Sequence, residues 1–112
     1  MVESRSGVMI TKLFENDSVR VEKIALKAGA RTGFHGDGIP YTMIACTPGR
    51  TVRFDEQGKF LELLYLEPGL QWRRSASFAH DVMNVSDGDV FMLKVFDKRA
   101  VRKKKASRGK RP

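Results

Sequence analysis

The sequence has little of several residue types: its 112 residues include one cysteine, Cys46, one tryptophan and two histidines. A single cysteine cannot form an internal disulfide, which fits a reducing compartment. No apolar run reaches the roughly eighteen residues of a membrane-spanning helix, and the N-terminal residues lack the basic and apolar segments of a signal peptide. We therefore expect a soluble, cytoplasmic protein with one domain, because this length supports one modest core.

Acidic residues are absent from the C-terminal segment 98–112, which carries nine of the 21 Lys and Arg residues. The remaining twelve basic residues face all 13 Asp and Glu residues in 1–97, so this part of the chain is close to neutral. We interpret residues 1–97 as one folded domain and residues 98–112 as a flexible basic tail. The domain has no basic excess of its own, so we expect no membrane binding, and nucleic-acid binding only through the tail.

Short apolar runs recur along the chain after a polar start, and few are long enough for a three-turn helix. Clusters of Gly, Pro, Asp, Asn and Ser separate them, which is typical of turns between strands. The spacing of about ten residues predicts an all-β sandwich or barrel. The predicted strands are residues 8–14, 19–26, 41–46, 51–54, 60–66, 70–74, 80–85 and 90–96.

Two of these segments carry further information about packing. In the strand predicted at 41–46, Tyr41, Met43 and Ala45 share one face. The segment 60–66, FLELLYL, is apolar on both faces apart from Glu62. It is either a central strand or a strand whose outer face is covered by a second subunit, and we expect a homodimer.

Two polar clusters, residues 29–41 and 69–84, contain both histidines of the chain, His35 and His80. Neutral imidazole is the commonest ligand of transition metals, and a nearby carboxylate can complete a mixed site. His35 and Asp37 are two residues apart, so on an extended strand they would project from the same face.

The spacing within these clusters resembles the two motifs of the cupin family. The first cluster is similar to G(X)5HXH(X)3–4E(X)6G, with Gly29, His35, Asp37 at the second His, Tyr41 or Thr42 at the Glu, and Gly49. The second cluster is similar to G(X)5PXG(X)2H(X)3N, with Gly69, Ser75 at the Pro, Ser77 at the Gly, His80 and Asn84. The chain is especially similar to small single-domain bacterial cupins of the β-alanine-degradation type. This resemblance implies a cupin-like double-stranded β-helix, a jelly-roll barrel, and it also supports the homodimer.

The resemblance implies a metal site with departures from the family pattern. Cupins with an intact site hold a divalent metal through three His and one Glu. Here His35 and His80 remain, Asp37 replaces a His, and Tyr41 is a fourth ligand or a proton donor. Two His and one carboxylate would form a facial triad, and Fe, Zn, Ni or Mn are all compatible with such donors.

A further pair of residues points to the ligand. Trp72 and Arg74 lie two residues apart on one predicted strand face, which looks into the barrel in the similar cupins. Arg binds carboxylates in a bidentate manner and Trp offers an amphipathic wall, so the pair indicates an acidic small-molecule ligand. A register shifted by one residue would instead place both side chains in solvent or at a dimer edge.

Two functions remain open at this point. The first is a metal-binding cupin that binds or acts on a small organic acid, with dioxygenase, decarboxylase or isomerase chemistry available if it is an enzyme. The second is a metal-free binding or sensory module with an unknown ligand. The orientation of Asp37 discriminates between them: convergence with both imidazoles favours metal, and an outward Asp37 favours the second reading.

Overall fold

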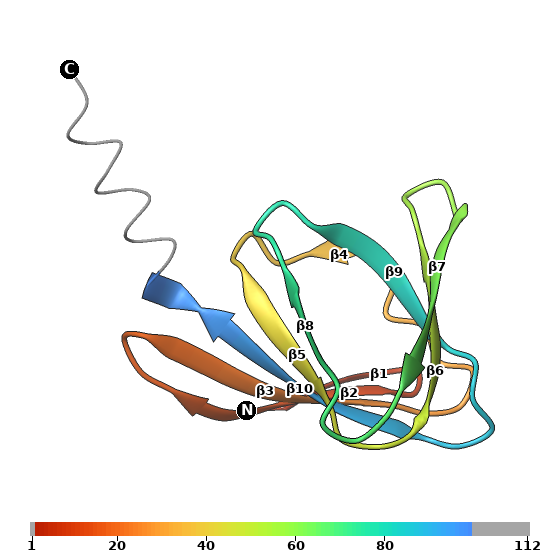
Figure 1. Ribbon diagram of the computed structural model, residues 1–112, viewed down its shortest axis with the longest axis horizontal. Coiled ribbons are helices and arrows are strands. Elements are labelled where there is room, and N and C mark those ends of the chain that lie inside the picture. Colours follow the sequence, from red (N-terminus) through yellow and green to blue (C-terminus); the bar gives the residue numbers. More distant parts are fainter. Residues whose placement is uncertain (1, 100–112) are drawn as a thin grey trace.

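The computed structural model describes residues 2–99, which form two facing antiparallel sheets (Figure 1). Their ten strands are β1 (Val2–Arg5), β2 (Val8–Glu15), β3 (Val19–Leu26), β4 (His35–Gly36), β5 (Tyr41–Ala45), β6 (Gly49–Phe54), β7 (Phe60–Leu66), β8 (Gln71–Arg74), β9 (Ala79–Asn84) and β10 (Val90–Asp97). The part of the chain described contains no helix long and apolar enough to cross a bilayer.

The strand order shows how distant segments of the chain are brought together. One sheet has six strands in the order β1-β2-β3-β10-β5-β8, and the other has four in the order β4-β9-β6-β7. Every strand pair is antiparallel. Non-consecutive neighbours such as β3 and β10 are typical of a jelly roll, in which two sheets enclose an interior. The prediction of an all-β jelly-roll barrel is confirmed.

All eight predicted strands are present, with ends that differ by at most two residues. The sequence reading missed two strands. β1 lies in the segment read as a polar start and pairs with β2 through a turn at Gly7, whose φ of 84° favours glycine. β4 has only two residues, too few for any period to be visible in the sequence.

The core lies between the sheets and follows the alternation of the strands. Tyr41, Met43 and Ala45 are all buried, as their shared face predicted. On β10 every second residue is buried, and in this inward-facing row a lysine, Lys94, stands between Met92 and Phe96. The interior therefore contains a cationic side chain among apolar ones.

The segment FLELLYL forms β7, which is the edge strand of the four-stranded sheet (Figure 1). The alternative of a central strand is therefore wrong. Leu61, Leu63 and Tyr65 share the face turned away from the interior and remain exposed. The apolar character of both faces reflects an outer surface that this single chain leaves uncovered.

Most of the segment predicted as a flexible tail, residues 100–112, lies outside the described residues. Lys98, its first residue, is described and continues from β10. Its backbone N–H donates to the Ser18 carbonyl at 3.0 Å, and its Nζ lies 2.9 Å from Glu15 Oε2. This residue is therefore held against the β2–β3 hairpin.

Asn84 connects three segments through its fully buried side chain. Its Nδ2 donates to the Leu26 carbonyl at 3.0 Å and to the Gly88 carbonyl at 2.9 Å, and its Oδ1 accepts from the Ser86 N–H at 2.9 Å. The cupin-like motif ends on this residue because its amide satisfies buried backbone groups of β3 and of the β9–β10 turn.

We predict that Asn84→Ala lowers the free energy of unfolding by about 3 kcal/mol, because the buried Leu26 carbonyl, the Gly88 carbonyl and the Ser86 N–H lose their partner. Urea denaturation measures this change. Gln57→Ala, at an exposed turn position, is the control and should have almost no effect. An Asn84→Ala protein as stable as the control would contradict this role.

Candidate functional site

The two histidines meet because β4 pairs with β9. His35 lies opposite His80 in the ladder, and their ring centroids are 5.1 Å apart in an edge-to-face arrangement. The Nδ1–H of His35 donates to the Gly33 carbonyl at 2.9 Å. This hydrogen bond places the lone pair of His35 on Nε2.

His80 is buried, and its surroundings keep it neutral. Burial, and to a smaller extent the charges of His35, Arg53, Lys94 and Arg74, together lower the pKa of His80 to about 3. Burial acts because a charged imidazolium loses its hydration, and the cations act by repulsion. The interior near His80 therefore has a positive electrostatic potential.

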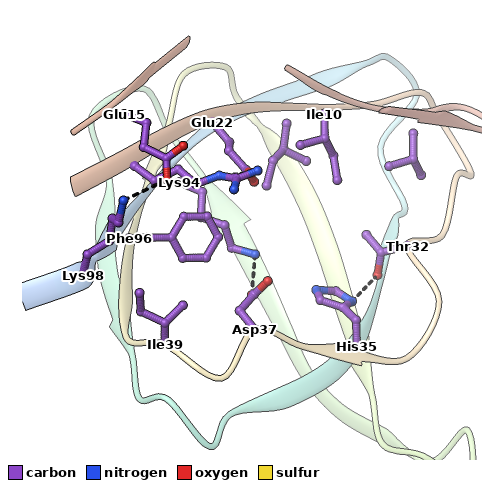
Figure 2. Close-up of a pocket in the computed structure, with 13 residues that line it drawn as sticks. Ile10, Glu15, Glu22, Thr32, His35, Asp37, Ile39, Lys94, Phe96 and Lys98 are labelled. Carbon is purple, nitrogen blue, oxygen red and sulfur yellow. Dashed lines mark hydrogen bonds and ion pairs between the residues drawn. The ribbon is translucent and has the colours of Figure 1, made fainter. Parts of the chain in front are cut away.

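Asp37 does not join the histidines. Its Oδ2 lies 2.6 Å from the Nζ of Lys94, with which it forms an ion pair. Figure 2 shows the Lys94 side chain directed at Asp37, while His35 is joined to Thr32 instead. The buried ammonium takes the carboxylate because an unpaired buried charge is strongly destabilising.

Tyr41 lies beneath Lys94, whose Nζ is 4.4 Å from the centre of the phenol ring. Burial, and then the negative charge of Asp37, raise the pKa of Tyr41 to about 12. The phenol is therefore neutral near pH 7, and a neutral phenol is a poor metal ligand.

The residues present do not fit the metal site that the sequence suggested. Within residues 2–99 no three His, Cys, Asp or Glu side chains are placed so that they could hold an ion together. The set His35, Asp37, His80 and Tyr41 thus reduces to two imidazoles, fewer than the three protein ligands of a catalytic zinc site. Nearby cations would also repel a divalent ion at His80.

Two cavities adjoin the histidines. The outer cavity has a volume of about 530 Å³ and lies between β2, β3, β10 and the segment 32–39 (Figure 2). The inner cavity has a volume of about 50 Å³ and lies inside the barrel. The walls of both include Ile24, Thr32, His35 and Lys94, so the two spaces adjoin at these side chains.

Trp72 and Arg74 both line the inner cavity. Their strand, β8, alternates between exposed and half-buried residues, so Arg73 turns to solvent while Trp72 and Arg74 turn inward. The register shifted by one residue is therefore excluded. β5 fixes this register, because Tyr41 pairs with Arg74 and Met43 with Trp72.

Arg53 also lines the inner cavity, and Glu62 contacts both arginines from behind the cavity wall. Glu62 Oε1 accepts from Arg53 Nε at 2.8 Å and from Arg74 Nη2 at 3.1 Å. Both guanidinium groups also lie over the Phe78 ring, at 4.6 and 4.4 Å from its centre. The two arginines thus share one carboxylate and one aromatic face.

Two buried polar atoms of this site have no hydrogen-bond partner within the described residues 2–99: Arg74 Nε and His80 Nδ1. Both residues line the inner cavity. Buried polar atoms in proteins are nearly always paired with protein, water or ligand. An acceptor group that enters this cavity could therefore take a hydrogen bond from the Nε–H of Arg74. At about 10–15 Å³ of this measure per water, the inner cavity admits a few atoms and no more.

Sequence reasoning missed Lys94, Arg53 and Glu62. The signal for each was the two-residue period of a strand. Lys94 lies two residues from both Met92 and Phe96 and therefore shares their buried face. Arg53 lies two residues from Thr51, which is also buried. A charged residue at an inward position of a predicted strand is a candidate site residue, as the two histidines are.

Comparisons with known proteins agree on the architecture. No family model matches the sequence, and no curated protein is significantly similar to it. The structure is similar to that of a cupin domain from Bordetella pertussis, with a TM-score of 0.76 and 24% sequence identity over 86% of this chain and 98% of that one. The protein has a cupin fold.

Further solved structures show the same fold at lower identity. A double-stranded β-helix protein from Klebsiella pneumoniae has a TM-score of 0.68 and 14% identity, covering 86% of this chain and 81% of that one. An oxalate decarboxylase from Lactobacillus farciminis, in complex with formate, has a TM-score of 0.68 and 16% identity, and the match covers 87% of this chain and 30% of the enzyme. The cupin fold thus includes enzymes.

We predict that His80 remains neutral in the folded protein well below pH 6.5. The unfolded imidazole binds a proton below its ordinary pKa of 6.5, whereas the folded one does so only near pH 3. Above pH 6.5 this difference in proton binding does not affect the free energy of unfolding. Below pH 6.5 it lowers the free energy of unfolding by about 1.4 kcal/mol per pH unit as the pH falls toward 3. NMR titration of the His80 ring checks the assignment; a midpoint near 6 would contradict it.

Proposed function

We propose that this cupin barrel is a metal-free binding protein for a small organic anion. Its ligand places a carboxylate in the inner cavity, against Arg74 and His80, and its remaining atoms in the outer cavity. The observation that carries this proposal is the pair of buried, unpartnered atoms, Arg74 Nε and His80 Nδ1, on the wall of one cavity.

The charges around the inner cavity support an anion. Arg53, Arg74 and Lys94 all contribute to its wall. An N–H of Arg74 directed at a carboxylate would form a charge-assisted hydrogen bond, which is about twice as strong as a neutral one. The same cations disfavour a divalent metal at the imidazoles, so we propose the metal-free reading of the two that the sequence left open.

The size of the outer cavity supports a small molecule. Its volume of about 530 Å³ lies within the range of roughly 300–1,000 Å³ that is usual for small-molecule sites. Apolar side chains such as Ile10, Ile39 and Phe96 line it together with charged groups. This mixture suits the body of an organic acid whose carboxylate points toward His35 and Lys94.

We also propose that β7 forms the interface of a homodimer. Among the described strands β7 pairs only with β6, so the N–H and C=O groups along its other edge can pair with a second chain. Leu61, Leu63 and Tyr65 are exposed on its outer face. A second copy placed about a two-fold axis would pair β7 with β7 and set these apolar side chains beside their copies on one continuous sheet face.

We predict that Arg74→Gln strongly weakens ligand binding. A panel of small carboxylic acids, screened by thermal shift and measured by calorimetry, should stabilise the wild-type protein. The substitution should weaken the best ligand by about 100-fold, because a buried charge-assisted hydrogen bond is lost.

Arg73→Gln is the matched control, since Arg73 is the neighbouring residue on the outward face of the same strand. Equal weakening in both variants would contradict the proposed site. Elemental analysis of protein prepared without added metal should find no stoichiometric metal. Stoichiometric metal that disappears in His35→Ala and His80→Ala would overturn the metal-free reading.

For the dimer, we predict that Leu63→Lys gives a monomer, because two lysines would be brought together at a β7–β7 interface. Light scattering during size-exclusion chromatography should report twice the chain mass for the wild type. Leu13→Lys, at an exposed position on β2 in the other sheet, is the control and should remain a dimer. A monomeric wild-type protein would contradict the interface.

A further inference from the structure

The charged groups around the two cavities are almost balanced. Five cationic side chains line the cavities, and four carboxylates contact them, as counted over residues 2–99. Three of the cations each contact a carboxylate that no other cavity-lining cation contacts: Arg20 with Glu22, Lys94 with Asp37, and Lys98 with Glu15. Glu15 also accepts from Lys12 on the outer surface.

The exception is the pair Arg53 and Arg74. Both donate to the same oxygen of one carboxylate, Glu62 Oε1. One positive charge is therefore left without a counter-ion, and it resides on two guanidinium groups that lie over the same Phe78 ring. Both side chains are largely buried, at 13% and 17% exposed, so water screens this charge only in part.

We propose that the ligand is a monoanion and that Glu62 determines this charge. This inference rests on the proposed function, since it concerns the acid bound at Arg74. A monocarboxylate would neutralise the one uncompensated charge. A dianion would add a second negative charge that none of the cavity-lining cations within residues 2–99 is left to balance, and a neutral ligand would leave the excess positive charge as it is.

The position of Glu62 suits this role. It lies on β7 opposite Arg53 in the ladder between β6 and β7, and its carboxylate reaches across to Arg74 of the other sheet. Two arginines could bind two carboxylates, and Glu62 is one of them. Removing its charge without changing its shape would make both arginines available to a ligand.

Butyrate and succinate provide the test, because both have four carbons and differ by one carboxylate. Calorimetry at neutral pH should show that the wild-type protein binds butyrate at least about tenfold more tightly than succinate. Glu62→Gln should shift this ratio toward succinate by about tenfold or more. Glu67→Gln, which removes an exposed carboxylate just beyond β7, should leave the ratio unchanged.

The double variant Arg53→Gln with Glu62→Gln makes the test independent of simple damage to the site. It restores a single positive charge on Arg74, so the preference for butyrate should return. Thermal unfolding of each variant checks that it is folded. A preference that stays with succinate in the double variant would overturn the charge argument.

The outcomes also separate this inference from the proposed function. If the wild-type protein binds succinate as tightly as butyrate, or if Glu62→Gln leaves the ratio unchanged, the ligand charge is not set by Glu62, although the carboxylate site stands. If neither these acids nor any other of the carboxylate panel binds, the proposed function fails, and this inference fails with it.

Discussion

A lysine at an inward-facing position of a small β-barrel must have a counter-charge nearby, because an unpaired buried ammonium is very costly. Lys94 meets this requirement with Asp37, across a contact of 2.6 Å between β10 and the segment that precedes β5. The consequence extends beyond the pair. Asp37 is removed from the histidines, the two imidazoles are left without a carboxylate, and Lys94 becomes part of the walls of both cavities.

The same requirement organises the other end of the inner cavity. Arg53 and Arg74 come from different sheets and converge on Glu62 and Phe78. Because one carboxylate serves two arginines, the barrel keeps a positive potential, and this potential helps to keep His80 neutral. The proposed binding of an acid, and of no metal ion, follows from this charge.

The motif residues that the chain shares with cupins divide into two groups. Asn84 and Gly49 serve the fold: Asn84 satisfies buried backbone groups, and a side chain at Gly49 would approach Val90 Cγ1 to 2.5 Å. The pairing of β4 with β9 places His35 opposite His80, whether or not an ion lies between the two rings. Motif spacing is therefore evidence for the barrel and only weak evidence for its ion.

The sequence by itself determined the architecture: apolar runs at ten-residue intervals, turn residues between them and the cupin-like spacing predicted the strands and the jelly roll. It also predicted that Trp72 and Arg74 share a face, because alternation along a strand is a local property. Only the tertiary structure decided the chemistry of the interior. Whether Asp37 meets His80 or Lys94, and whether Glu62 serves one arginine or two, depends on pairings between strands far apart in the chain. Competition among buried charges resolves those pairings, and spacing along the sequence does not encode it.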